Sequence, residues 1–523
     1  MNKMKNFSDK QNQLLFWGCF AALAATSFGF IVRTQVIGAW GIEFGLSETE
    51  KGEIFGVGLW PFCISIILFS LIVDRIGYGL SMIIAFGLHV VSAIVTILAD
   101  GYWMLYIGTF ILALGNGTVE AAINPVVATI YPKEKTKWLN ILHAGWPAGL
   151  VLGGILAILM GPETSWKWKV ALVLIPVIIY GFVLWGRKFP VQERVKAGVS
   201  YKDMLSEAGA LGFFLILYIV LLEINRVAGL SPLVEGELFS LPHISLTLLL
   251  VAVTMAYYLY TESYGRPLFI ILLLIMVPLA TTELGTDSWI TELMVPFLGD
   301  NAGWVVVYTA LIMMILRFYA GPIVHRISPL GLLALSSAIA LVGLMILSGA
   351  TGFMIFIAAT IYGLGKTFFW PTMLGVAGER FPKGGALTLN AITGVGMLAA
   401  GVFGAAFLGN IQDKQIDRDL MAQNPAVHAK AMGDEKSSIF GDYKPIDQQK
   451  VSSLSSSDKS VISNIQTNAK QGALSTVAVF PAIMLVSYLG MMMYFRSIGG
   501  YRPIHLNEEE ISEDSVDTLG EEE

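Results

Sequence analysis

Long apolar runs set the strongest limit on what this chain can fold into. Runs of about 18 residues or more recur along its whole length, separated by turn-rich or charged breaks. An α-helix of that length spans about 30 Å of hydrocarbon at 1.5 Å per residue. Only 14% of the 523 residues are charged, whereas an average soluble domain has about 25%. The sequence therefore predicts an all-α integral membrane protein with about fourteen transmembrane helices.

The expected spans follow a pattern of six, two and six. They lie near residues 12–38, 49–73, 79–99, 103–131, 137–160, 168–186, 209–226, 242–260, 267–292, 302–325, 330–349, 352–375, 386–409 and 473–496. The start of the chain also resembles a cleaved signal peptide. Its apolar character continues past Arg33, however, so we interpret it as the first transmembrane helix. The expected divisions are a cytoplasmic N-terminus (1–11), an N-terminal six-helix bundle (12–187), a connector with two inserted helices (188–266), a C-terminal six-helix bundle (267–496) and an acidic tail (497–523).

The distribution of lysine and arginine predicts how these helices are oriented. Short loops and tails on one side of the expected bilayer hold most of them, including Lys133, Lys135, Arg187 and Arg194. Positive residues mark the cytoplasmic side. We therefore expect both termini in the cytoplasm and the protein in the cell inner (cytoplasmic) membrane. The long connection 410–472 is then extracytoplasmic, and its Ser-, Asp-, Gln- and Lys-rich composition predicts mobility.

Composition and motifs also exclude several classes of protein. The net charge of −6 is carried largely by the acidic tail, so no nucleic-acid partner is expected. Cys19 and Cys63 both lie in apolar runs, which predicts neither a disulfide nor a metal site. The sequence contains no H-E-x-x-H, G-x-S-x-G or phosphate-binding glycine loop. We therefore expect no enzyme, no cofactor and no ATP hydrolysis, so an ion gradient should be the driving force. We also expect the protein to be a monomer.

An internal repeat relates the two groups of six spans. Pro132 precedes "KEKTKWLN", which ends at Asn140, and Pro382 precedes "KGGALTLN", which ends at Asn390; both pairs are offset by 250 positions. A helix dense in small residues follows each asparagine, "GWPAGLVLGG" in the first half and "GVGMLAAGVFG" in the second. Small residues let helix backbones approach closely in a bilayer. The repeat therefore predicts two similar bundles.

A second pair of matching segments carries a family resemblance. The segments "SLIVDRIGYG" (70–79) and "GPIVHRISPLG" (321–331) are offset by 251. They resemble the loop signature G-x-x-x-D-R-x-G-R-R of the major facilitator superfamily. The resemblance implies two pseudo-symmetric six-helix bundles, with two extra central helices here. It also implies an inner-loop gate at the matching positions, which are Asp74, Arg75, Gly77, Gly321, His325 and Arg326.

Within that superfamily, two stretches resemble the fucose permease family of sugar:proton symporters. The first is "VEAAINPVVATIYP" followed by "LNILHAGWPAGLVLGG", which matches that family's Glu-x-x-x-Asn-Pro and Leu-Asn motifs. The second, "ATTELGTDSW" (280–289), looks like its seventh-helix glutamate motif. The family's first-helix aspartate falls near Thr34 here, and its fifth-helix glutamine is His143. The resemblance implies proton coupling and a sugar as solute.

Polar residues inside the fourth and fifth spans are the candidates for proton coupling. Asn116, Glu120 and Asn124 follow each other at four-residue spacing, so they share one helix face. Ionisable residues within spans usually face a polar cavity. A buried carboxylate and a histidine can both exchange protons near neutral pH. We therefore expect Glu120 and His143 to meet and to carry the proton, with a permanent ion pair at Glu120 and a packing role for His143 as the alternatives.

Charged residues in other spans extend the candidate site. Arg33 and Glu283 share the offset of 250, which predicts an ion pair between the halves that closes a gate, binds solute or only neutralises charge. Arg317 lies near the inner end of its span, where its side chain is expected to reach the membrane surface. The expected solute-binding residues are Arg33, Trp60, Asn116, Asn124, Asn140, Trp146, Glu283, Asp287, Trp289, Lys366, Trp370 and Asn390.

These side chains favour a secondary active transporter that moves a small polar solute across the bilayer by alternating access. The mixture of amides, charges and tryptophans favours a sugar, because aromatic faces stack on sugar rings. Proton symport is what the family resemblance implies, together with the placement of Glu120 and His143. The same mixture fits a sugar acid or another organic anion. Fourteen spans also occur in proton-driven exporters of amphipathic compounds. A non-transporting membrane sensor is the alternative from another class.

Overall fold

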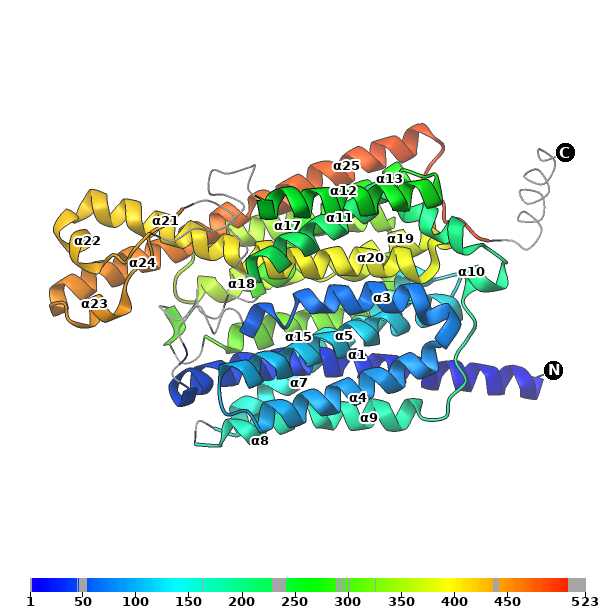
Figure 1. The fold of residues 1–523 in the computed structure, drawn as a ribbon, viewed down its shortest axis with the longest axis horizontal. Coiled ribbons are helices and arrows are strands. Elements are labelled where there is room, and N and C mark those ends of the chain that lie inside the picture. The colour runs from blue at the N-terminus through cyan, green and yellow to red at the C-terminus, as the bar shows by residue number, and fades with distance from the viewer. Residues whose placement is uncertain are drawn as a thin grey trace.

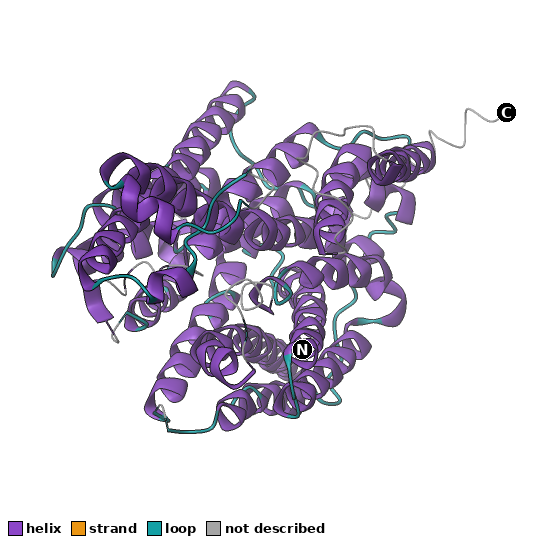
Figure 2. Ribbon diagram, turned by 60° about the vertical axis from the view of Figure 1, so that its left-hand side comes forward, coloured by secondary structure: helices purple, strands orange, loops and turns teal. Residues whose placement is uncertain are grey.

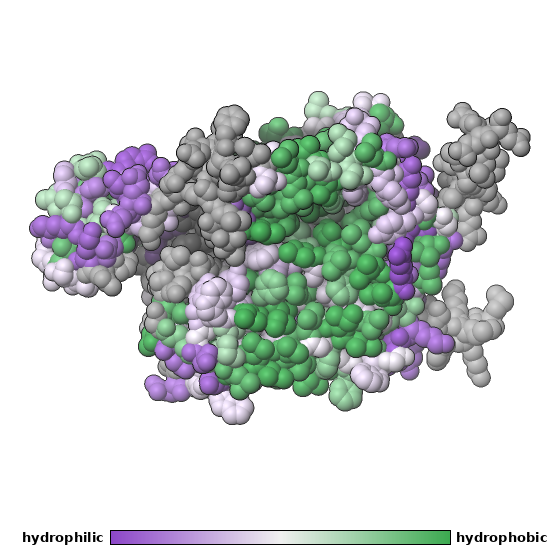
Figure 3. Space-filling model, in the orientation of Figure 1, coloured by the Kyte–Doolittle hydropathy of each residue, from purple (hydrophilic) through white to green (hydrophobic). Residues whose placement is uncertain are grey.

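The computed structural model describes residues 2–44, 46, 54–161, 163–227, 241–287, 290, 294, 297–299, 302–324, 326–435 and 442–506. These residues form helices and their connections, with one isolated β-bridge between Met432 and Ile446. Eleven of the described helices are long and apolar enough to cross a membrane, and two shorter apolar helices cover 245–261 and 304–318. Hydrophobic residues cover the middle of the visible face, and hydrophilic residues lie at both ends (Figure 3). The all-α membrane class is confirmed.

The first six expected spans are all helical. They correspond to α1 (Asn2–Phe44), α3 (Trp60–Ile76), α4 (Tyr78–Ile97), α5 (Tyr102–Ile130), α6 (Lys135–Leu142) with α7 (Gly145–Leu159), and α8 (Trp166–Ala171) with α9 (Leu174–Leu184). The break between α6 and α7 falls at His143 and Ala144, just before Pro147. Because proline has no backbone N–H to donate, an interruption here is expected. It places His143 at a turn in the middle of the fifth span.

The connector and the inserted pair follow as α10 (Glu193–Lys196), α11 (Tyr201–Val227) and α12 (Leu241–Thr261). A kink divides α11 at Gly209, whose φ of 61° favours glycine. The N–H of Ala210 donates to the Ser263 carbonyl at 2.9 Å, which ties this kink to the end of α12. Further along α11, Ile219 packs with Trp60 and Leu398. The first inserted helix, α11, therefore packs across the seam between the two halves.

The second group of six begins with α13 (Pro267–Ala280), the π-helical turn η1 (Thr281–Gly285), α15 (Trp304–Phe318) and α16 (Ala320–Val324). It continues with α17 (Pro329–Leu347), α18 (Met354–Lys366), α19 (Phe369–Arg380), η3 (Pro382–Gly384), α20 (Gly385–Leu398), the π-helical η4 (Ala399–Gly404) and α25 (Val479–Ser497). The two π-helical turns pack on each other at Gly285 and Gly404. Such turns occur often at functional sites because they re-aim side chains. Here η1 carries Glu283.

The helices lie side by side along the long axis of the molecule (Figure 1). When the bundle is turned, its helices lie in two neighbouring groups (Figure 2). The two halves meet where α3 packs on α20, α6 on α19 and α7 on α15. The start of α1, the end of α25 and α10 lie at one end of the bundle, which we call the connector end (Figure 1).

The connection 410–472 differs from its expectation. Its described residues fold into α21 (Ala405–Gln423), α22 (Pro425–Ala431), α23 (Gln448–Ser452) and α24 (Ser456–Val477), which project from the end opposite the connector (Figure 1). These helices share a small core that includes Leu420, Val427 and Ile462. The expectation of mobility was therefore wrong, because average composition concealed apolar residues at helical spacing.

Close contact between α1 and α7 generates a test of this packing. Gly149→Ala should destabilise the protein, because its Cβ would lie 2.3 Å from the Ala24 carbonyl oxygen. Overpacking costs about 1–3 kcal/mol, whereas Gly→Ala at an open helical position gains up to about 1 kcal/mol. Gly87→Ala on α4 is the matched control, since a Cβ there meets nothing within 4 Å. The melting temperature of detergent-purified protein should fall only for Gly149→Ala; equal melting temperatures would contradict the close contact.

Candidate functional site

A buried polar network joins α5 to the turn between α6 and α7. Asn124 Nδ2 donates to Glu120 Oε2 at 3.2 Å, and Asn124 Oδ1 lies 3.0 Å from His143 Nε2. Because an amide oxygen only accepts, this contact places a hydrogen on Nε2. All three side chains are buried. The expected direct contact between Glu120 and His143 is therefore corrected: the amide of Asn124 stands between them.

Asn116 does not extend this network. Its Oδ1 lies 3.0 Å from His89 Nε2, and the other ring nitrogen of His89 lies 3.0 Å from the Tyr180 hydroxyl. Asn116 is thus turned toward α4 and α9. A helix turn separates it from Glu120, and its partners belong to the packing of the N-terminal half.

Arg317 is the central residue that sequence reasoning missed. Its side chain is only 1% exposed. Nη2 donates to Glu283 Oε1 at 2.9 Å, Nη1 to the His143 carbonyl at 2.8 Å and Nε to the Thr367 carbonyl at 2.6 Å. Arg317 therefore connects both halves and does not reach the membrane surface. Its position in an apolar span was the available signal, since buried charges in spans usually have a function.

The structure also corrects the expected ion pair between Arg33 and Glu283, because Arg33 does not pair with this carboxylate. Arg33 is 4% exposed, and its Nε and Nη1 atoms have no hydrogen-bond partner. Its guanidinium lies 5.9 Å from the ring centre of Phe30 and 5.4 Å from that of Phe55. The shared offset of 250 gave a matching depth for Arg33 and Glu283. It gave no information about the nearer cation, Arg317.

A second buried ion pair lies close to the first. Lys366 Nζ donates to Asp287 Oδ1, and it lies 5.1 Å from the ring centre of Tyr362. The Tyr362 hydroxyl donates in turn to the Thr282 carbonyl. Lys366 and Asp287 were both expected in the site, and the structure brings them together. Their charges neutralise each other.

The tryptophans occupy different settings. Trp60 and Trp370 are buried; Trp60 packs in a cluster with Leu398, and Trp370 lies close to Gly396. Trp146 is partly exposed and lies 6.1 Å from the ring of Phe30. Trp289 falls outside the described residues. Trp146 is therefore the tryptophan placed nearest the aromatic surroundings of Arg33.

The two repeat asparagines each cross between the halves. Asn140 Nδ2 donates to Thr372 Oγ1 on α19 at 3.3 Å. Asn390 Nδ2 donates to Ser70 Oγ on α3 at 2.7 Å and to the Ala121 carbonyl at 3.1 Å. Both side-chain oxygens lack a partner. The asparagines thus combine contacts between halves with a free acceptor each.

At the connector end, residues of the inner-loop signature bind the connector. Asp74 accepts a hydrogen bond from Arg194 in an ion pair. With its amide oriented to satisfy both neighbours, Gln192 donates to Asp74 Oδ1 at 2.8 Å and accepts from the Ala386 N–H of the other half. Arg75 lies 5.8 Å from the ring of Tyr201. The connector therefore links Asp74 to the start of α20.

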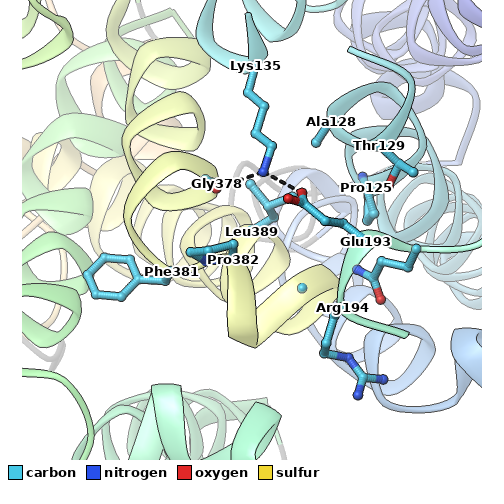
Figure 4. A pocket seen from close by; sticks show the side chains of 12 residues that line it. Pro125, Ala128, Thr129, Lys135, Glu193, Arg194, Gly378, Phe381, Pro382 and Leu389 are labelled. Carbon is cyan, nitrogen blue, oxygen red and sulfur yellow. Dashed lines mark hydrogen bonds and ion pairs between the residues drawn. The ribbon is translucent and has the colours of Figure 1, made fainter. Parts of the chain in front are cut away.

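The other signature positions lie around the same end. Gly77 adopts a φ of 81° after α3, and Gly321 packs against Lys137. Arg326 is exposed, and His325 falls outside the described residues. Beside them, Lys135 pairs with Glu193 at 2.6 Å and reaches the Gly378 carbonyl at 3.4 Å (Figure 4). These residues line a small pocket between the halves.

Glu379 completes the closure of this end. Thr136 on α6 donates to its Oε1, and Tyr501 donates to its Oε2 at 2.8 Å. The backbone N–H of Ile504 also donates to the Glu379 carbonyl at 2.7 Å. Burial and the neighbouring carboxylate raise the pKa of Tyr501, so its hydroxyl remains a donor at neutral pH. One carboxylate thus holds both halves and the segment that follows α25.

Two helical halves that meet around buried charges, and that contact each other at one end, have the architecture of an alternating-access membrane transporter. A comparison with protein families identifies the group. The model described as "Major Facilitator Superfamily" matches residues 14–406. The chain therefore belongs to this superfamily. The related proteins and solved structures named below are transporters and not enzymes.

Individual relatives and solved structures agree with this assignment. The chain is 27% identical to a hexuronate transporter of Bacillus subtilis (strain 168) over 31% of its length and 38% of that protein. It is 24% identical to a cis,cis-muconate transport protein of Acinetobacter baylyi over 32% of its length and 41% of that protein. Among solved structures, the proton:xylose symporter XylE superposes with a TM-score of 0.59 at 13% identity, over 91% of this chain and 96% of that one. FucP in the outward conformation gives 0.52 at 14% identity, over 91% and 99%. The structural likeness shows the fold, and the matched segments span less than half of the two relatives.

Breaking the Arg317–Glu283 pair should destabilise the protein strongly. Arg317→Met leaves the Glu283 carboxylate and two carbonyls buried without their donor. Removing one partner of a buried pair costs about 3–5 kcal/mol. Adding Glu283→Gln should restore part of that loss, because no uncompensated charge then remains. If the single and double variants melt at the same temperature, the two side chains are not coupled.

Loosening the Glu379 contacts should open the connector end. Thr129→Cys places a reporter in the pocket of Figure 4, in a chain whose own Cys19 and Cys63 are buried. In this background Glu379→Gln should speed maleimide labelling, and Tyr501→Phe should do so to a smaller extent. Glu163→Gln, at an exposed site, is the control and should leave the rate unchanged. Unchanged labelling in Glu379→Gln would show that this carboxylate does not hold the end closed.

Proposed function

We propose that the protein is a proton-coupled secondary transporter of a small polyhydroxylated solute, a sugar or a sugar acid. The two halves rock about a central site between them, as in other transporters of this architecture. The observation that carries the proposal is the buried network of Glu120, Asn124 and His143, which continues through Arg317 into the other half. We further propose an inner-membrane location with both termini in the cytoplasm.

Glu120 is the proposed proton site because its surroundings suit a carboxyl group that changes its protonation. Its side chain is 3% exposed. The hydrogen bond that it receives comes from the neutral amide of Asn124, and no cation pairs with it among the described residues. An isolated buried carboxylate is costly, whereas its protonated form is not. Proton uptake and release at Glu120 therefore alter the stability of the closed centre.

The network supplies the route by which this proton affects both halves. His143 contacts Asn124 through its ring and Arg317 through its carbonyl oxygen. A change at Glu120 can shift the Asn124 amide, then His143, and then Arg317 with Glu283. Each step is a direct contact between neighbouring groups, so a proton bound in the first half biases how the second half packs.

The choice of solute rests on the composition of the site and on the relatives. Amides with free acceptors, paired charges and the partly exposed Trp146 suit a hydroxylated ring with an apolar face. Relatives include a hexuronate transporter and a D-xylose-proton symporter-like protein. Sugars and sugar acids are the chemistry that these names have in common.

Replacing Glu120 with glutamine separates coupling from binding. In proteoliposomes with an acidic exterior, the wild-type protein should accumulate a radiolabelled solute above equilibrium. Glu120→Gln should not accumulate it above equilibrium, while exchange between pre-loaded and external solute persists, because exchange needs no net proton movement. Exposed Glu163→Gln is the matched control. If Glu120→Gln still concentrates solute to the wild-type level, Glu120 is not the coupling residue.

A further inference from the structure

Within the part of the chain that the structure describes, Arg33 is a buried guanidinium without a counter-charge. It lies on α1, 4% exposed, and no described residue accepts a hydrogen bond from it. Phe30 and Phe55 flank it at 5.9 and 5.4 Å from their ring centres. It also packs tightly on the turn before α3, since a Cβ at Gly58 would lie 2.1 Å from its Nη1. An unpaired buried charge is strongly unfavourable, so its presence indicates a partner that comes and goes.

The acids in the centre of the protein are not available to be that partner. Glu283 is held by Arg317 at 2.9 Å. Asp287 is held by Lys366. Both pairs are neutral as pairs, so they add no net charge to the site. Among the described arginine, lysine, aspartate and glutamate side chains named above for the spans, Arg33 and Glu120 are therefore the two left without an ion-pair partner.

We propose that Arg33 binds a carboxylate group of the solute, and that one proton on Glu120 enters with it. The transported solute is thus a monocarboxylate, such as a sugar acid, and its symport with a proton is electroneutral. This inference rests on the proposed function. It adds the ionic class of the solute and the charge that moves in each cycle.

The sum of the two unpaired charges in the spans, Arg33 on α1 and Glu120 on α5, explains why proton and carboxylate would move together. With Glu120 ionised and no solute bound, its charge and that of Arg33 sum to zero. A bound carboxylate alone leaves one negative charge, and a bound proton alone leaves one positive charge. With both bound, the sum returns to zero. Closing the two halves around a net charge removes that charge from water at high cost, so the empty and the doubly loaded states are the ones that can interconvert.

The chemistry of the guanidinium favours a carboxylate over a hydroxyl group. Arginine presents planar pairs of N–H donors that match the two oxygens of a carboxylate. Neither Nε nor Nη1 is engaged by the protein. A neutral sugar would leave the positive charge of Arg33 uncompensated when Glu120 is protonated. The ring centre of Trp146 lies 6.1 Å from that of Phe30, which flanks Arg33. Trp146 is therefore placed to face the ring of a solute bound at Arg33.

Uptake into proteoliposomes tests the electroneutral cycle with two defined probes, D-glucuronate and D-glucose. Under an inward proton gradient the full-length protein should accumulate glucuronate, and a membrane potential imposed with potassium and valinomycin should leave its initial rate unchanged. Acceleration by an inside-negative potential overturns electroneutrality. Accumulation of glucose but not glucuronate overturns the carboxylate while the proposed function stands. If neither probe accumulates, the proposed function fails for this solute class, and the Arg33 assignment is then decided by binding.

Binding to purified protein tests Arg33 without any gradient. D-glucuronate should raise the melting temperature of wild-type protein but not that of Arg33→Gln. Arg187→Gln, which alters an exposed guanidinium, should respond like the wild type. Without ligand, Arg33→Gln should melt at the wild-type temperature or above it, because a buried unpaired charge is removed. Equal stabilisation of Arg33→Gln by glucuronate overturns the assignment. Equal stabilisation of the wild type by sulfate at the same ionic strength shows a general anion site and also overturns it.

Discussion

The guanidinium of Arg317 is the group on which the centre of this protein depends. It donates hydrogen bonds to the Glu283 carboxylate, the Thr367 carbonyl and the His143 carbonyl, and only 1% of its surface is exposed. The acceptors around it offset the cost of burying such a cation inside a membrane protein. Because one of those acceptors belongs to the other half, the arginine also fixes where the halves meet. The position of His143, and through it Asn124 and Glu120, follows from this contact.

Carboxylates that accept hydrogen bonds from several segments also hold the connector end together. Glu379 accepts from Thr136 of one half and from Tyr501 after α25, while Asp74 accepts from the connector residue Arg194. Each contact is between a carboxylate and a donor that rocking of the halves would separate. Hydrogen bonds of this kind contribute modestly to stability in the presence of water. They suit an end of the molecule that must open and close, whereas the fully buried Arg317 suits a permanent link.

The sequence predicted the architecture better than the pairing of its charges. Span lengths and the offset of 250 depend on periodicity, which reads directly from the chain, and Asn140 and Asn390 both contact the opposite half as equivalent positions. The partner of Glu283 depends on which of two buried arginines reaches it, and side-chain reach is not encoded in an offset. Its place near the end of its helix predicts that Arg317 reaches the membrane surface, yet its partners are the His143 and Thr367 carbonyls and the Glu283 carboxylate. Likewise, the folding of α21 to α24 depends on a few apolar residues that overall composition averaged away.

The proposed coupling depends on Glu120 holding the transported proton. Infrared difference spectroscopy of the purified protein, moved from mildly alkaline to mildly acidic buffer, observes that proton directly through the C=O stretch of a protonated carboxyl group. We expect this band to grow on acidification of the wild-type protein and to be missing in Glu120→Gln. The same band in both proteins, or no band in the wild type, would contradict the proposed coupling.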